Sequence, residues 1–167
     1  RSSAASDVYK RQELHLFDGF MFKTSFGADY NNLYRRSFSP KYDEINASEK
    51  LSGLSNRNAW NFNWVFTNTL NYTKTFGDHT INALLGLESL RNRYEYFTAS
   101  RDGFPSDDPN FHFLDAGDVG TQKNSGSATE YSMVSYFGKI DYNYHDRYLV
   151  AFTLRRDGSS RLGNNKW

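Results

Sequence analysis

The sequence predicts an all-β fold, an antiparallel meander of about five long strands. Apolar and polar residues alternate with a period of two over long stretches, the pattern of a strand with one apolar and one polar face. Short connections rich in Gly, Asp and His alternate with long ones, and no convincing helical period lies between the strands. Aromatic residues make up 17% of the 167 residues and charged residues 23%, so an otherwise polar chain must give its rings an apolar environment.

The first two expected strands are Phe20–Tyr30 and Ala59–Lys74. In the first, Phe20 and Phe22 share one face and Lys23 lies on the other. In the second, six of the eight even-numbered positions are apolar or aromatic, and six of the eight odd-numbered positions are polar. Read as a helix, the apolar residues of the second segment would spread around the whole circumference, which favours the strand.

The remaining three expected strands have the same design. Thr80–Ser89 places Ile81 and Leu85 opposite Glu88. The fourth begins near Val134 and the fifth near Tyr148, and each again alternates apolar with polar residues.

The connections are unequal in length. Thr75–Asp78 and His145–Arg147 are tight turns, whereas residues 31–58 and 98–130 form long loops. Short turns at one end of a meander and long loops at the other are typical of outer-membrane barrels. The sixteen residues of Ala59–Lys74 span about 53 Å, or about 37 Å of height when tilted. An outer-membrane belt needs only ~25 Å.

These features favour a transmembrane β-barrel. A barrel needs about eight strands to close, so the expected strands form only a piece of a large one. Alternation alone also fits a soluble β-sheet with a dry core, so that alternative stays open. In the barrel, the lipid-facing side chains are Phe20, Phe22, Trp60, Phe62, Trp64, Phe66, Leu70, Tyr72, Tyr148, Val150 and Phe152. The candidates for the wet lumen are Lys23, Asn61, Asn63, Asn71, Glu88, Lys139, Asp141 and Arg155.

Composition argues against several other classes of protein. The net charge of +1 gives no basic excess for nucleic acid, and the absence of cysteine excludes disulfide scaffolds and thiolate sites. The four histidines share no local pattern with a nucleophile or acid, and no Gly-rich loop precedes a helix, so we expect neither an enzyme nor a cofactor. Five aspartates in one long loop are more typical of solvated acids than of a calcium site: Asp102, Asp107, Asp108, Asp115 and Asp118.

Residues 1–12 are set apart from the fold. Ser2–Gln12 resembles the in-frame translation of a common sequencing adapter, and the segment lacks the apolar core of a signal peptide. We therefore expect residues 1–12 to be disordered and residues 13–167 to be a partial barrel.

A motif in the last third of the chain carries a family resemblance. Residues 135–139 read SYFGK, Tyr142 and Tyr144 follow, and Arg156 opens an RDGSSR run. This order resembles the barrel of SusC/RagA-type TonB-dependent outer-membrane transporters, with Lys139 and Leu162 as conservative departures. Asn68–Glu88 and Phe20–Tyr30 are also similar. The Asp157, Gly158, Ser159 and Ser160 motif is expected to begin a tight turn where the fifth strand leaves the membrane.

The resemblance implies a barrel of about 22 strands with a plug, in the outer membrane of a Gram-negative bacterium, which the chain crosses several times. It also implies import of glycans or peptides, coupling to the TonB complex through a plug that is absent from this sequence, and a SusD-like surface lipoprotein as partner. Two alternatives remain at this point. They are a passive porin-like channel and a soluble, aromatic-rich carbohydrate-binding module.

Overall fold

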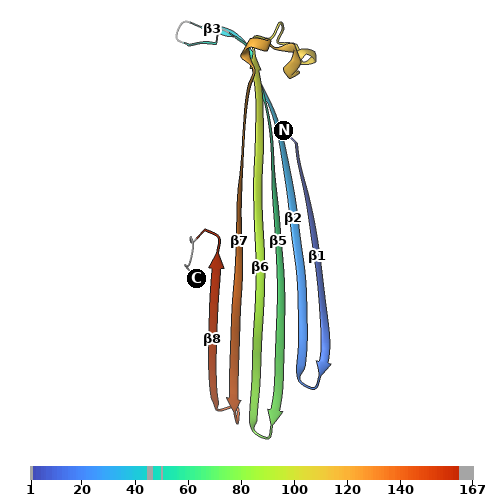
Figure 1. Ribbon diagram of the computed structural model, residues 1–167, viewed down its shortest axis with the longest axis vertical. Coiled ribbons are helices and arrows are strands. Elements are labelled where there is room, and N and C mark those ends of the chain that lie inside the picture. The colour runs from blue at the N-terminus through green and yellow to red at the C-terminus, as the bar shows by residue number, and fades with distance from the viewer. Residues whose placement is uncertain (1, 45–46, 50, 162–167) are drawn as a thin grey trace. The chain divides into compact units, whose positions relative to one another are not determined.

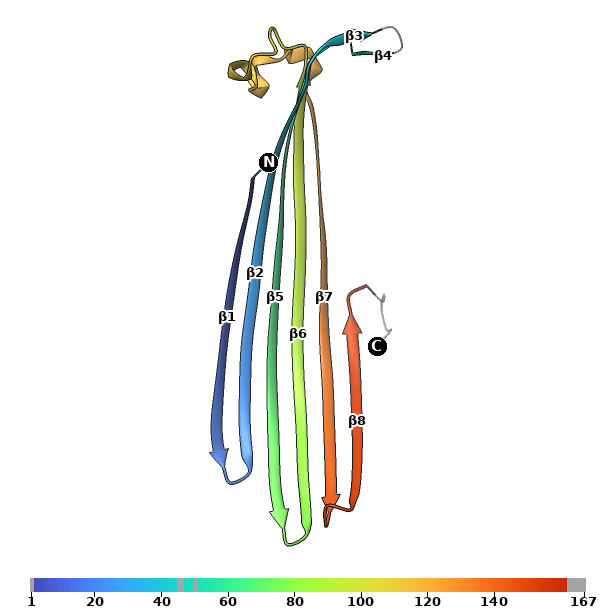
Figure 2. The same cartoon turned by 180° about the vertical axis from the view of Figure 1, so that it is seen from behind.

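The computed structural model describes residues 2–44, 47–49 and 51–161, and most of them lie in strands (Figure 1). Three short 3₁₀ turns, at Pro109–Phe111, Leu114–Ala116 and Val119–Thr121, interrupt the second long connection. Figure 2 shows the same arrangement from behind. The strands are β1 (Ser2–Phe17), β2 (Phe20–Ser39), β3 (Tyr42–Glu44), β4 (Ala47–Glu49), β5 (Gly53–Phe76), β6 (His79–Asp102), β7 (Lys123–Tyr144) and β8 (Tyr148–Ser159).

Six strands form one open antiparallel sheet in the order β1-β2-β5-β6-β7-β8, and β3 and β4 form a separate hairpin. Each strand of the large sheet therefore pairs with the strand that precedes or follows it in that sheet, as in a meander. The predicted all-β meander is confirmed, with one more strand in the large sheet than expected and the short β3–β4 hairpin besides. Among the described residues, no helix has the length and apolar character needed to cross a membrane.

The expectation that residues 1–12 are disordered is wrong for the described residues, because β1 begins at Ser2 and pairs with β2. All sixteen residues of β1 are exposed. The physical reason is that the edge of β2 offers unpaired backbone donors and acceptors to whatever chain precedes the turn at Asp18 and Gly19. The adapter origin of Ser2–Gln12 stays a prediction.

The strands are also longer than the alternation of apolar residues indicates. β6 continues to Asp102 although Arg91, Arg93 and Glu95 interrupt the apolar face that Ile81–Leu87 begins. Backbone pairing does not depend on side-chain polarity, so the strands continue past the end of their apolar stripe.

The residues divide into two compact units. Unit 1 holds residues 1–6, 30–61 and 94–129, and unit 2 holds residues 7–29, 62–93 and 130–167. The tight turns at Asp18–Gly19, Gly77–Asp78 and His145–Arg147 all belong to unit 2, at one end of it (Figure 1). Both long connections belong to unit 1. The short turns thus belong to one unit and the long connections to the other.

Backbone geometry explains the tight turns. Gly19 and Gly77 have φ of 80° and 59°, values that glycine adopts without steric cost. The third turn instead places His145 and Asp146 at φ of 57° and 53°. His145 has partners on the neighbouring turn: its N–H donates to Asp78 O at 2.9 Å, and its Nε2 lies 2.9 Å from Asp78 Oδ2.

Little of the described chain is buried. The buried apolar residues among those described are Leu54, Ala59 and Phe104. Large apolar side chains stay exposed instead, including Phe152 at 64% and Leu85 at 65%. No second layer covers either face of the described sheet, so the rings do not form the two-layer core that the soluble alternative requires.

Candidate functional site: the two faces of the strands

Contacts across the strands sort the side chains into a polar face and an aromatic face. On the polar face of unit 2, Asn63 Nδ2 donates to Asp29 Oδ1 at 2.9 Å, and Asn92 donates to Asn63 Oδ1. The three residues come from β2, β5 and β6. Asn71 Nδ2 lies 3.3 Å from Thr69 Oγ1 on the same strand. Amide and carboxylate groups therefore cross-link neighbouring strands on this face.

A second polar cluster of unit 2 is centred on Arg155 of β8. Arg155 Nε donates to Asp157 Oδ1 at 2.9 Å, and its Nη2 donates to Ser135 Oγ at 3.1 Å. The same Nη2 lies 3.5 Å from Glu88 Oε1, and Thr67 Oγ1 donates to Glu88 Oε2 at 3.3 Å. Ser135, only 1% exposed, lies beneath this cluster.

Three more predicted polar-face residues form ion pairs within unit 2. Lys139 Nζ lies 2.8 Å from Asp141 Oδ2, two residues along β7. Lys23 Nζ lies 3.1 Å from Glu13 Oε1. Glu13 was not predicted as a site residue because it precedes the first expected strand. These exposed pairs contribute little stability but leave the face hydrated.

The polar face of unit 1 carries arginines and tyrosines. Arg57 Nη2 donates to Tyr94 OH at 3.2 Å, and Arg57 Cζ lies 4.2 Å from the centre of the Tyr96 ring. Together with Asn61 and Arg35, Arg57 and Tyr94 line a hollow of about 420 Å³. Sequence reasoning missed Arg57, Tyr94 and Tyr96. Arg57 continues the odd-numbered polar positions of β5 that include Asn61 and Asn63. Tyr94 and Tyr96 continue the even-numbered positions of β6 that include Glu88 and Asn92.

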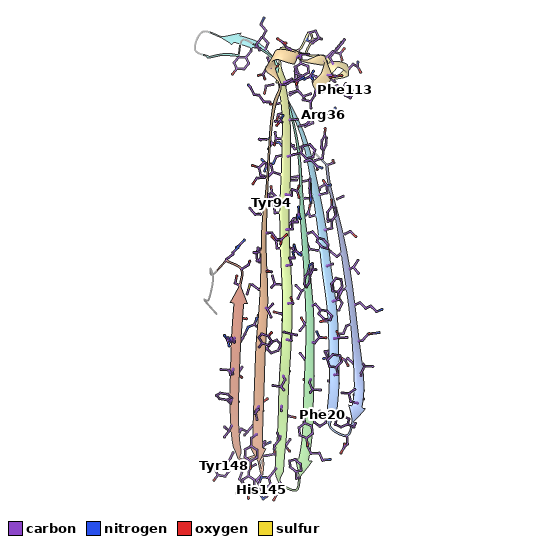
Figure 3. The ribbon with its side chains drawn as sticks, in the orientation of Figure 1. Phe20, Arg36, Tyr94, Phe113, His145 and Tyr148 are labelled. Atoms are coloured by element: carbon purple, nitrogen blue, oxygen red, sulfur yellow. The ribbon has the colours of Figure 1, made fainter. Side chains whose placement is uncertain are left out.

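Aromatic residues gather near the tight turns on the other face. The Phe20 and Tyr72 rings are 4.4 Å apart, and Phe17 lies 4.6 Å from Phe20. His79 Nδ1 lies 2.7 Å from Tyr142 OH, and the Tyr144 and Tyr148 rings stack at 6.3 Å. Figure 3 labels Phe20, His145 and Tyr148 in this region. Rings with a polar group are typical of the boundary between lipid and water.

The rest of the aromatic face is apolar and open. Phe62, Phe66, Tyr148, Val150 and Phe152 are between 40% and 68% exposed. Phe22, Trp64 and Leu70 are half-buried in unit 2, and in unit 1 Trp60 is half-buried and lies 6.5 Å from the Phe97 ring. A hollow of about 750 Å³ on unit 2 lies over Gly138 and Ala83 among Leu85, Ile140 and Phe152. Its apolar lining suits hydrocarbon rather than a polar solute.

The apolar stripe of unit 2 ends at a charged pair that sequence reasoning missed. Arg91 Nη2 lies 2.7 Å from Glu130 Oε1. Arg91 follows Ile81, Leu85 and Leu87 at odd positions of β6, so alternation places it on the aromatic face. This pair sets one limit to the part of the face that hydrocarbon could cover.

The loop aspartates act as caps and ion-pair partners. Asp108 and Asp118 accept backbone N–H bonds at the starts of 3₁₀ turns, while Asp102 and Asp115 pair with Lys123 and Arg101. Within the part of the chain that the structure describes, no three acidic or histidine side chains converge on one point.

The connection between β6 and β7 packs on β2 in unit 1, where Arg36 lies over the Phe113 ring (Figure 3) and His112 stacks on Phe38 at 3.7 Å.

The expected turn at Asp157–Ser160 begins later than predicted. Ser159 and Gly158 still pair with Met133 and Val134, and the turn starts at Ser160. The reason is that β7 continues to offer backbone partners beyond Asp157. Leu162, the last position compared in the motif, lies outside the described residues.

Comparison with known proteins explains the two-faced strands. No family model matches the chain. TonB-dependent receptor P39 of Formosa agariphila is 30% identical over 163 residues, covering 97% of this chain and 16% of the receptor. SusC of Bacteroides thetaiotaomicron is 29% identical over 109 residues, covering 65% of this chain and 10% of the receptor. The chain is similar to a barrel segment of a SusC/RagA-type TonB-dependent receptor.

Solved structures show the same likeness. The RagAB peptide transporter superposes with a TM-score of 0.88 at 26% identity, covering 98% of this chain and 18% of that one. The RagAB peptide importer in its 'open-open' state gives 0.89 at 26% identity, covering the same shares of both chains. The receptor-like segment thus spans about a sixth of the length of the curated relatives it matches. These relatives are named as receptors or transporters, which are not enzymes.

Proposed function

We propose that the receptor-like segment forms part of the wall of a TonB-dependent importer in the outer membrane of a Gram-negative bacterium. Its aromatic face meets lipid and its polar face lines the water-filled lumen. The observation that carries the proposal is the cross-strand sorting of side chains. Asn63 joins Asp29 and Asn92 on one face, whereas Phe20 joins Tyr72 on the other.

Lipid accounts for the exposed aromatic face. Contiguous apolar patches larger than a few hundred Å² are rare on soluble monomers. Here apolar side chains more than 60% exposed follow one another along β8 at every second position, at Tyr148, Val150, Phe152 and Leu154. Hydrocarbon removes this surface from water, and the Arg91–Glu130 pair suits the headgroup region.

The polar face suits the passage of a large hydrated solute. Its amide, hydroxyl and carboxylate groups form hydrogen bonds to one another, as Thr67, Glu88 and Arg155 do, and they remain open to water. Such a wall exchanges hydrogen bonds with a peptide or glycan at little cost. By analogy with the relatives, we further propose that the TonB complex supplies the energy for import through a plug domain. We also propose that a SusD-like lipoprotein is a partner at the outer surface.

A chimaeric importer tests the orientation of the two faces. Residues 13–161 replace the matched segment of the RagAB peptide importer on a cysteine-free background, and single cysteines are placed at Phe66 or Thr67. A bimane label at position 66 should be quenched by brominated lipid, and a label at position 67 by aqueous iodide. The reverse pattern, or aqueous quenching at both positions, would contradict the proposed wall.

Peptide uptake by the same chimaera separates import from passive passage. Uptake of a labelled peptide should stop when TonB is deleted, because the relatives are TonB-dependent receptors. Uptake that continues without TonB at an unchanged rate would favour a porin-like channel. Unmodified RagAB in the same strain is the control.

A further inference from the structure

The polar face of unit 1 contains two arginines that face each other across neighbouring strands. Asn63 lies opposite Asp29, and Thr73 N–H donates to Gly19 O at 2.8 Å, so β2 and β5 keep one register over this length. From the Asp29–Asn63 pair, moving toward Ser39 on β2 and toward Gly53 on β5 by three steps of two residues brings Arg35 opposite Arg57. Both side chains line the hollow of about 420 Å³ in this unit.

This pairing is unfavourable without a counter-charge. Like charges directly opposite in a sheet destabilise it. The residues that line the hollow include Asn31, Asn61 and Tyr94 but no Asp or Glu. Among the described residues, Arg35 makes no hydrogen bond, ion pair or ring contact. The repulsion between the two arginines is therefore not offset by an acid in the lining of the hollow.

The neighbouring tyrosines hold one of the two guanidinium groups in place. Arg57 lies over the Tyr96 ring and donates to the Tyr94 hydroxyl. A guanidinium has five N–H donors in a planar fork, so these contacts leave donors for a bidentate acceptor. Arg35 is exposed and its long side chain can turn toward the same acceptor.

We propose that Arg35 and Arg57 form a binding site for a carboxylate group of an acidic solute, with the Tyr94 and Tyr96 rings beside it. A carboxylate accepts two parallel N–H bonds from Arg57 and neutralises its repulsion with Arg35. The hollow has room for the bound group and the residue or sugar that carries it. This inference rests on the proposed function, because it gives the lumen wall a preference for acidic over neutral cargo.

The purified RagAB chimaera provides the test, with hexaglutamate and hexaglutamine as probes. Hexaglutamate should bind more tightly, and its affinity should fall steeply with added salt. Arg57→Gln and Arg35→Gln should each weaken hexaglutamate binding by about tenfold or more while leaving hexaglutamine within twofold. Arg91→Gln, which removes an arginine from the other face, is the matched control and should change neither affinity. Oligogalacturonate and a neutral galactose oligomer repeat the comparison for sugars and show which carrier the site prefers.

Several outcomes would overturn the inference. One is an unchanged hexaglutamate affinity in both arginine variants, and another is an equal loss for both probes, which would indicate a structural role for Arg57. Arg35→Gln keeps the test decisive if Arg57→Gln fails to fold, because Arg35 supports no described contact. The bimane labels could be quenched by lipid at position 66 and by iodide at position 67 while the chimaera shows no preference for acidic probes. That result would reject this site and leave the proposed lumen wall supported.

Discussion

Arg155 on β8 reaches Glu88 on β6 across the intervening strand β7, with Nη2 3.5 Å from Oε1. Ser135 on β7 makes this possible, because its short side chain lies beneath the guanidinium and accepts a hydrogen bond from it at 3.1 Å. The contact joins three strands on the polar face. Its integrity depends on the small volume at position 135.

A larger residue at position 135 should break the three-strand contact. In the chimaera, Ser135→Leu should cost about 1–3 kcal/mol of unfolding free energy, because the position is buried and overpacking displaces its neighbours. Ser135→Ala loses one hydrogen bond and should cost no more than about 1.5 kcal/mol. Urea unfolding in lipid vesicles measures both, and equal costs would mean that volume is not what matters there.

Charge should be tolerated on one face of β5 and not on the other. Phe66→Arg places a cation in hydrocarbon and should cost about 2–4 kcal/mol near the centre of the belt. Thr67→Arg places it in the lumen beside Glu88 and should cost much less. Folding yield and unfolding midpoints in vesicles compare the two variants, and the soluble alternative predicts no dependence on lipid.

Gly86 should be intolerant of a side chain. A Cβ added at Gly86 would lie 2.2 Å from the Phe137 ring. Gly86→Ala should therefore destabilise by about 1–3 kcal/mol, and a second change, Phe137→Leu, should recover part of that loss. Gly120→Ala is the control, since the nearest atom lies 3.5 Å from the added Cβ. A strictly additive double variant would refute the steric explanation.

The turn between β1 and β2 should make stability depend on pH. The hydrogen bond from Lys74 and its positive charge lower the pKa of Asp18. Ionised Asp18 thus favours the folded state at pH values above its ordinary pKa near 4. That contribution is lost as the pH falls through the lowered folded-state pKa. Asp18→Asn should remove this part of the acid dependence, which urea midpoints between pH 7 and pH 3 would show. Asp146→Asn, in another tight turn, is the comparison.

Alternation along single strands was enough to predict the meander, and it places Phe20 and Tyr72 on one face, although their ring contact appears only in the structure. It could not predict that β6 continues past Arg91, because strand length there depends on backbone pairing rather than side-chain polarity. Nor could it predict the burial of Phe104, whose N–H donates to Ser52 Oγ, 52 residues away in sequence. The Arg35–Arg57 pair was also missed, because it appears only once the register of β2 and β5 is known.

The bond between the third tight turn and the second bears on how the sheet assembles. His145 N–H donates to Asp78 O, so the loop of one hairpin is anchored to the loop of the hairpin before it. A slip of β7 along β6 by two residues would break this bond and the contact between His145 Nε2 and Asp78 Oδ2 together. Asp78 precedes β6 and His145 follows β7, so this contact encloses both strands and costs more loop entropy than the contacts within each hairpin. The hairpins β5–β6 and β7–β8 can therefore close first, and the bond between their turns then fixes how β7 aligns with β6.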